Sequence, residues 1–286
     1  MIHPVIKLSL LFCVRHRKQS MLYEAAVMKD YSHVVVNNTC LEKYREPAEI
    51  QQKWLTSNVA DIADFFQIPR SPAFLSQAES FQHVHFKAGQ RVFISGEKAD
   101  ALYLVNSGFT KSLILDESGN EQVVNFQMKG NILGVDGIHG GEHHSEAVAL
   151  ADSDIILLPI KKLKALSHTF RQFDNAMLNL LSMELVHQQN RLCLLAARNA
   201  EVRVANFLLN LAERFFALGY SRSIFNLRMT RNDLGSYLGL SLETVSRTLS
   251  FLHASGWIDV NNRGIIIRDE LSLKNLTGIR KGITRN

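Results

Sequence analysis

Three side chains with complementary hydrogen-bonding chemistry follow one another at helical spacing near the C-terminus: Glu243, Ser246 and Arg247. Positions three and four apart share one face of an α-helix. On such a face the guanidinium of Arg247 can donate two bonds to guanine, the carboxylate of Glu243 can accept from cytosine N4, and the hydroxyl of Ser246 adapts to a thymine methyl or a phosphate. The triplet therefore suits the reading of base edges, although Glu243 and Arg247 also have the spacing of an ordinary surface ion pair.

Two short helices joined by a tight turn are predicted around this triplet. The first begins after Thr230, carries Asp233 three residues later as a variant of the capping box, and runs to about Leu238. Gly239 supplies the turn, because a left-handed backbone costs glycine little. Ser241 then caps the second helix.

The second helix is expected to continue to about Ser255, and Gly235 allows the two helices to approach closely. Their common core is expected from aliphatic side chains at Leu234, Leu238, Leu240, Val245 and Leu249. Trp257–Val260 and Gly264–Arg268 are predicted to form a two-stranded wing. A small residue, a turn glycine and an aliphatic residue at these spacings are typical of a helix-turn-helix, so the whole arrangement favours DNA binding.

Residues near the two predicted helix N-termini are placed to hold phosphates; they are Thr230, Arg231, Ser241 and Thr244. The charge agrees, because residues 200–286 hold twelve lysines and arginines against seven acids, which accounts for the whole net charge of +5. A basic module joined to a neutral body suits contact with phosphates. Double-stranded DNA is therefore the predicted partner.

Upstream of this module the sequence pattern changes several times. The segment Glu46–Phe66 has a helical pattern, with Ile50, Trp54, Val59, Ile62 and Phe66 on one face. Strands separated by glycine turns are then predicted at 81–86, 91–94, 101–105, 109–115, 122–126 and 154–158, with a turn at 117–120. Several short strands at this spacing indicate an antiparallel barrel or sandwich. From Pro159 to Gly219 the pattern is helical.

A long helix is predicted from about Phe170 to Arg198, and along it residues alternate by three and four to form a heptad seam of Leu178, Leu181, Leu185, Gln188, Leu192 and Leu195. A helix packed on its own barrel would give the same pattern over two heptads. A seam this narrow between two domains more often pairs with a second copy, and Gln188 would bury no like charges there. We therefore expect a homodimer.

The stretch MTRNDLGSYLGLSLETVSR (229–247), together with LYLVNSG (102–108) and GEHH (141–144), resembles the CRP/FNR family of bacterial regulators, and most closely its FNR branch. The resemblance covers about Phe81–Gly278. It implies an α+β fold with an N-terminal antiparallel β-roll (a double-stranded, cupin-like β-helix), a long dimerisation helix and a C-terminal winged helix-turn-helix. The implied division is a variable segment 1–70, a β-roll sensor 71–168, a dimerisation helix 169–199 and a DNA-binding domain 200–286.

The resemblance also implies function. The family's base-contacting positions fall on Glu243, Ser246 and Arg247, and with serine in the middle the FNR-like proteins favour inverted repeats of TTGAT. Contact with RNA polymerase through exposed β-roll loops is implied in the same way.

Cyclic-nucleotide binding is not expected. Relatives that bind cyclic AMP need a Gly-Glu pair and an Arg-Ser pair around the phosphate, and the matching stretches here are LGVD (133–136) and HHS (143–145). No arginine occurs between Arg91 and Arg171, so a phosphate would lack its bidentate partner. Asp136 would repel it as well.

The three cysteines, Cys13, Cys40 and Cys193, are too few and too far apart for a disulfide framework or for the four-thiolate cluster of the oxygen-sensing relatives. The position that resembles a further cluster ligand is Ile156. Since Gln188 stands where those sensors tend to carry an acid, we expect a dimer that forms without a cluster. Cys193 is expected to be buried by packing rather than to act as a redox switch.

The histidines leave an alternative open. His139, His143 and His144 lie in one glycine-rich loop, and His83 and His85 share a strand face, but no spacing completes a known metal site. No metal or other cofactor is therefore assigned. A regulator of the same family that senses haem or another small molecule is the alternative, with no residue named for it.

Other classes of protein are less well supported. We find no Gly-rich phosphate loop, G-x-S-x-G or H-E-x-x-H, so an enzyme is not expected. A signalling adaptor whose winged helix binds protein remains an alternative. No apolar run reaches membrane-spanning length, and the apolar stretch Val5–Val14 has its basic residues on the wrong side for a signal sequence, so a cytoplasmic protein is expected. Translation could also begin at Met21 or Met28.

Overall fold

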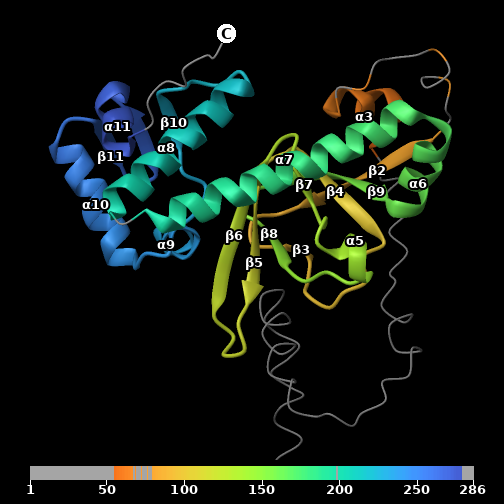
Figure 1. Cartoon of the computed structure of the whole chain (residues 1–286), viewed down its shortest axis with the longest axis horizontal. Helices are drawn as coiled ribbons and strands as arrows, with labels where there is room; N and C mark the ends of the chain where they lie inside the picture. The colour runs from red at the N-terminus through yellow and green to blue at the C-terminus, as the bar shows by residue number, and fades with distance from the viewer. Residues whose placement is uncertain are drawn as a thin grey trace, which may run out of the picture. The chain divides into compact units, whose positions relative to one another are not determined.

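The computed structural model of the chain describes residues 55–66, 68, 72, 76, 79–197 and 199–278 (Figure 1). Cys13, Cys40 and the alternative starts Met21 and Met28 lie outside these residues, so the expectations for them stay open. Within the described ranges, no helix has both the length and the apolar character needed to cross a bilayer.

Two antiparallel sheets form the first half of the described chain. One has the order β1 (Thr56–Asn58), β2 (Ser80–Phe86), β9 (Ser153–Pro159), β4 (Ala101–Ser107) and β7 (Ile132–Leu133). The other has the order β3 (Arg91–Phe93), β8 (Glu146–Ala149), β5 (Phe109–Leu115) and β6 (Glu121–Met128). A shared apolar cluster joins the two sheets; its buried members are Phe93, Val105, Leu133, Ala147 and Ile155. This is the predicted antiparallel barrel.

The six strands predicted from alternation are all present, and three further strands were not predicted. β7 has only two residues, and β8 reads Glu-Ala-Val-Ala, which carries little strand preference of its own. β8 forms because it pairs with β3 on one side and β5 on the other, where Val148 lies opposite both Arg91 and Lys111.

A long hairpin of β5 and β6 turns at the predicted place. Asp116 accepts hydrogen bonds from the backbone N–H groups of Ser118 and Asn120 at 2.9 and 2.8 Å, and Gly119 takes a φ of +80°. An aspartate that bonds its own turn and a left-handed glycine are the local signals of such a loop. The register places Leu115 opposite Glu121.

The predicted helix over Glu46–Phe66 is wrong in part. Thr56–Asn58 is strand β1, paired with β2, and the helix α3 covers only Val59–Phe65. A capping box starts α3, because Asn58 Oδ1 accepts from Asp61 N at 3.0 Å and Asp61 Oδ2 accepts from Asn58 N at 2.8 Å. Ile62 is buried in the cluster under the first sheet, so this part of the segment 1–70 packs with the barrel.

The helical stretch predicted after Pro159 is present and divides into three helices, α6 (Ile160–Thr169), α7 (Arg171–Ala196) and α8 (Ala200–Ala217). α7 is the long helix in the centre of Figure 1, and its ends lie within two residues of the predicted ones.

The C-terminal part is a winged helix. It contains α9 (Arg231–Leu238), α10 (Leu242–Ala254), α11 (Glu270–Thr277) and a sheet in the order β10 (Ile224–Asn226), β12 (Gly264–Ile267), β11 (Ile258–Asn261). The two-stranded wing was predicted, and β10 was not. The fold is therefore the expected α+β combination of β-roll, long helix and winged helix-turn-helix.

One apolar cluster continues from the barrel into the winged helix. Phe109, Val123 and Phe126 of the β5–β6 hairpin belong to the same cluster as buried residues of α8, α9 and α10. The hairpin thus packs directly against the helix-turn-helix, so the barrel and the basic C-terminal module are in physical contact.

Candidate nucleic-acid interface

The first helix of the helix-turn-helix begins at the predicted capping box. The Thr230 hydroxyl accepts from Asp233 N at 3.0 Å, and Asp233 Oδ2 accepts from Thr230 N at 2.9 Å. Two N-terminal donors that have no partner inside the helix are satisfied in this way.

The turn between α9 and α10 depends on two glycines. Gly239 ends α9 with a φ of +63°, a left-handed conformation that favours glycine. A Cβ on Gly235 would lie 2.6 Å from the Leu240 carbonyl oxygen, so the backbone after the turn approaches α9 as closely as predicted. Arg203 of α8 completes the turn by donating to the carbonyl oxygens of Leu238 and Gly239 at 2.9 and 3.2 Å.

α10 presents the predicted triplet near its N-terminal end. Glu243 and Arg247 are exposed, and Ser246 is half-buried. In the described structure Glu243 and Arg247 form no ion pair within 4 Å, and Arg247 instead donates to the Thr244 hydroxyl at 3.4 Å. The pKa of Glu243 is lowered, first by its own backbone N–H, then by the Ser241 hydroxyl and the charge of Arg247. The triplet therefore offers an ionised acceptor and a donor with unused N–H groups.

The four residues expected to hold phosphates lie around the two helix N-termini. Thr230 and Ser241 are exposed N-caps, and the Ser241 hydroxyl accepts from Thr244 N at 3.2 Å. Arg231 is half-buried, and its guanidinium donates to the Asn262 carbonyl at the tip of the wing at 3.3 Å. Arg231 therefore links α9 to the wing as well as adding charge beside it.

Two further exposed arginines were missed by sequence reasoning. Arg263 lies in the wing turn and donates to the carbonyl of Arg228 at 3.4 Å, and Arg228 directly precedes α9. The signal available in the sequence was an arginine inside the predicted wing turn. Arginine side chains supply many of the phosphate contacts of DNA-binding proteins, so these two residues add to the basic surface around α9 and the wing.

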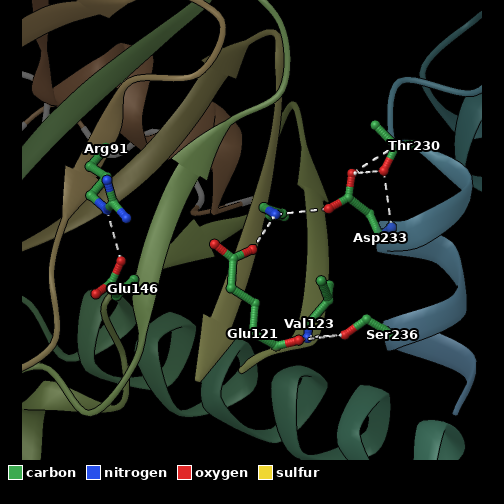
Figure 2. Close-up of polar contacts among 8 residues, drawn as sticks. Arg91, Glu121, Val123, Glu146, Thr230, Asp233 and Ser236 are labelled. Atoms are coloured by element: carbon green, nitrogen blue, oxygen red, sulfur yellow. Dashed lines mark hydrogen bonds and ion pairs between the residues drawn. The ribbon is translucent and has the colours of Figure 1, made fainter. Parts of the chain in front are cut away.

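The barrel hairpin supports α9 through polar contacts that join residues more than a hundred positions apart. Lys111 of β5 donates to Asp233 at 2.8 Å and to Glu121 at 2.9 Å. Figure 2 shows Asp233 with its bonds to Thr230, and beside it the bond from Val123 N to the Ser236 hydroxyl at 2.8 Å. Burial alone would lower the pKa of Lys111, but Asp233 and Glu121 hold it above its ordinary value.

The carboxylate of Asp136 is hydrogen-bonded within its own loop. Asp136, just before the short helix α5 (Gly137–Gly140), accepts from His144 N at 3.0 Å, Ser145 N at 2.7 Å and the Ser145 hydroxyl at 2.8 Å. The sequence predicted only repulsion of a phosphate by Asp136. The structure adds that three donors from His144 and Ser145 already bond its carboxylate.

The histidines are dispersed within the described ranges, where no three residues of the types His, Cys, Asp and Glu converge as metal ligands. His83 bonds Asp154 at 2.7 Å and Ser57 at 2.8 Å, His143 is buried against Phe93, and His139 and His144 are exposed. The expectation for Cys193 is wrong: its side chain is exposed on α7, next to the seam rather than in a core.

Comparison with known proteins places these features in a family. Residues 202–276 match the Crp-like helix-turn-helix domain, and residues 83–170 match the cyclic nucleotide-binding domain. The chain is 40% identical over 190 residues to the electron transport regulator A of Shewanella oneidensis, covering 66% of this chain and 76% of that protein. It is 37% identical over 195 residues to the fumarate and nitrate reduction regulatory protein of Escherichia coli K12, covering 68% and 78%.

The chain belongs to the CRP/FNR family of transcription regulators. Among solved structures it resembles FixK2 of Bradyrhizobium japonicum, with a TM-score of 0.64, 30% identity, and coverage of 68% of this chain and 96% of that one. The family resemblance drawn from residues 229–247 is confirmed, and the chain is a CRP/FNR-type regulator with a helix-turn-helix, not an enzyme.

Proposed function

We propose that this CRP/FNR-type regulator is a cytoplasmic homodimer that binds an inverted repeat of TTGAT-like half-sites through α10. The observation that supports the proposal most directly is the triplet Glu243, Ser246 and Arg247, in which the two charged side chains are exposed and form no ion pair with each other in the described structure. The N-terminal part of a recognition helix is the part that enters the major groove. Thr230, Arg231, Ser241 and Thr244 would then meet the phosphates on either side, and exposed β-roll loops would contact RNA polymerase.

The dimer would form along α7. Four leucines of the predicted seam are exposed, with fractional exposures of 61% for Leu178, 36% for Leu181, 59% for Leu185 and 64% for Leu192. Large apolar side chains in a row on one helix indicate a surface that a partner covers. Gln188 donates to Glu184 of its own helix at 2.7 Å, so the polar member of the seam is already satisfied. The proposed division is a β-roll to 168, a dimer helix at 169–199 and a DNA-binding domain from 200.

We further propose that the regulator works without cyclic nucleotide and without an iron–sulfur cluster. Asp136 supports the first point, because its carboxylate takes three donors of the phosphate-facing loop. Ile156 supports the second, because it is fully buried in β9 at the position where a cluster-bearing relative would place a ligand. That relatives carry a cluster ligand at the position of Ile156 is implied by the family resemblance alone.

The experiment is selection of bound sequences from random DNA, followed by measurement of affinity at several salt concentrations. We expect a TTGAT-like palindrome and a steep loss of affinity with salt, since released counterions drive such binding. Arg247→Ala should cost about 1–3 kcal/mol and relax the guanine preference. The matched control is Arg268→Ala, because Arg268 is bonded to Asp259 on the far strand of the wing at 2.7 Å. Salt-insensitive binding, or no palindrome, would favour the adaptor instead.

A further inference from the structure

A cavity of about 650 Å³ is lined by residues of β6, α7, α8 and α9. Its size falls within the range of small-molecule sites. Its lining combines apolar side chains with amides, two cations and a phenol; the polar residues that matter here are Asn125, Asn206, Asn210, Arg191, Arg214 and Tyr237. Nothing in the interface with DNA uses these residues.

Arg191 lines the cavity with only part of its guanidinium group hydrogen-bonded. Its Nη2 donates to the Val123 carbonyl at 3.0 Å, and its guanidinium lies 5.2 Å from the centre of the Tyr237 ring. Its Nε is buried and has no hydrogen-bond partner in the described structure. A buried donor without a partner is costly and rare in proteins, so it indicates a group that is satisfied when the site is filled.

Arg214 adds a second positive charge. Its Nη2 donates to the Phe126 carbonyl and to Asn131 Oδ1, both at 2.8 Å. Across the described residues, neither Arg191 nor Arg214 has a carboxylate within ion-pair distance. Burial lowers the pKa of both guanidinium groups, and arginine nonetheless stays protonated in proteins. Two half-buried cations therefore line one cavity, where the carboxylate of Glu213 is already paired with Arg222.

We propose that this cavity is an effector site for a small organic anion, whose carboxylate or phosphate group binds Arg191 and Arg214. Guanidinium groups bind planar oxyanions through paired, charge-assisted bonds. An organic anion would therefore compensate the positive charge of the two arginines and accept a hydrogen bond from Arg191 Nε. The amides of Asn125, Asn206 and Asn210 offer donors and acceptors to the rest of the molecule.

The position of the cavity explains how such a ligand would reach DNA binding. Arg191 bonds the carbonyl of Val123, and the N–H of Val123 bonds the Ser236 hydroxyl in α9. Tyr237, which carries the stacked Arg191, is the next residue of that helix. An anion that draws Arg191 toward itself therefore acts on the contacts between the barrel hairpin and the helix-turn-helix. This coupling rests on the proposed function, whereas binding of the anion does not.

Binding is tested first, without DNA. The full chain is titrated by calorimetry with inorganic phosphate and with malonate at constant ionic strength held with chloride. We expect saturable binding of at least one of them, with one site per protomer, and a loss of at least tenfold in affinity in Arg191→Met. Arg171→Met is the matched control, because Arg171 is exposed on the same helix and should bind like the wild type. No saturable binding in the wild type, or equal binding in Arg191→Met, would overturn the proposal.

A second variant protects the test against misfolding. Asn210 lines the cavity at an exposed position, so Asn210→Asp should leave the fold intact while its negative charge weakens anion binding by at least threefold. Unchanged affinity in this variant would contradict the site.

The effect on DNA is tested last, with the palindrome recovered by selection. Saturating anion at fixed ionic strength should change DNA affinity at least fivefold in the wild type and leave Arg191→Met unchanged. Anion binding with no change in DNA affinity would refute the effector role. If DNA is not bound at all while the anion is, the proposed function fails and the anion site stands.

Discussion

The Lys111–Asp233 pair offers a sharp test of how the barrel holds the helix-turn-helix. The two residues are 8% and 7% exposed, and Nζ lies 2.8 Å from Oδ1. At an effective dielectric constant of about 20, unit charges at this distance attract by about 6 kcal/mol, before the cost of removing both from water. We consider the change Lys111→Met, which keeps an unbranched side chain, one atom shorter, and removes the charge.

We expect Lys111→Met to lower the free energy of unfolding by about 3 kcal/mol. Losing one member of a buried pair costs about 3–5 kcal/mol, because the other charge stays buried without its partner. The lower end applies here, since Thr230 still donates two hydrogen bonds to Asp233. For a unit of this size the melting temperature should fall by about 6–12 °C.

The assay is urea unfolding followed by circular dichroism, with tryptophan fluorescence as a second probe. Lys87→Met is the matched control, because Lys87 bonds Asp152 at the same distance of 2.8 Å but both side chains are more than half exposed. Its stability should equal that of the wild type within error.

The double variant separates pairing from other effects of the substitution. Asp233→Asn removes the charge that Lys111→Met leaves behind, so the combined variant should lose clearly less stability than the two single changes added together. Additive losses, or a Lys111→Met variant as stable as the Lys87→Met control, would refute the view that this pair fixes the hairpin on α9.

Three further predictions follow from the same structure. Gly235→Ala would place a Cβ 2.6 Å from the Leu240 carbonyl, so we expect a loss of about 1–3 kcal/mol in urea unfolding, and unchanged stability would contradict the close approach. Leu185→Glu should convert dimer to monomer in sedimentation velocity while Ile114→Glu, at an exposed apolar position on the barrel hairpin, should not; a dimeric Leu185→Glu would exclude the α7 seam. Burial alone would raise the pKa of Asp233, but bonds from Lys111 and Thr230 hold it below 3.8, so its stabilising contribution is complete above that pH and is lost as the pH falls through the lowered value. Asp233→Asn should flatten the acid limb of a stability-against-pH curve, and an unchanged limb would show that Asp233 does not set it.

The parts of the fold that depend on local chemistry were predictable. The capping box at Thr230, the left-handed Gly239 and the β5–β6 turn are each specified by residues within four positions of one another. The helical pattern of residues 170–198 likewise predicted the ends of α7 within two residues. Hydrophobic periodicity and caps act over one or two turns of chain, so a single sequence displays them directly.

The unpredicted strands show where local chemistry is insufficient. The residues of β1 lie within a segment whose apolar side chains have helical spacing, yet they pair with β2. The helix begins only after them, at the capping box formed by Asn58 and Asp61. β8 has little intrinsic preference for a strand and is stabilised by the two neighbours that flank it. Whether a segment forms a strand, and between which neighbours it lies, depends on partners distant in sequence. A short stretch of sequence does not contain that information.

The sequence by itself determined the family, the helix-turn-helix and the face that carries Glu243, Ser246 and Arg247, because each depends on spacing along a few turns of helix. Only the tertiary structure decided which charges are paired. It brought Lys111 to Asp233 across 122 positions, gave Asp136 three hydrogen-bond donors from its own loop, and left Arg191 Nε buried without a partner among the described residues. The physical reason is that the free energy of a charged group depends on its burial and on the nearest opposite charge. The folded chain sets both through contacts between residues that lie far apart in the sequence.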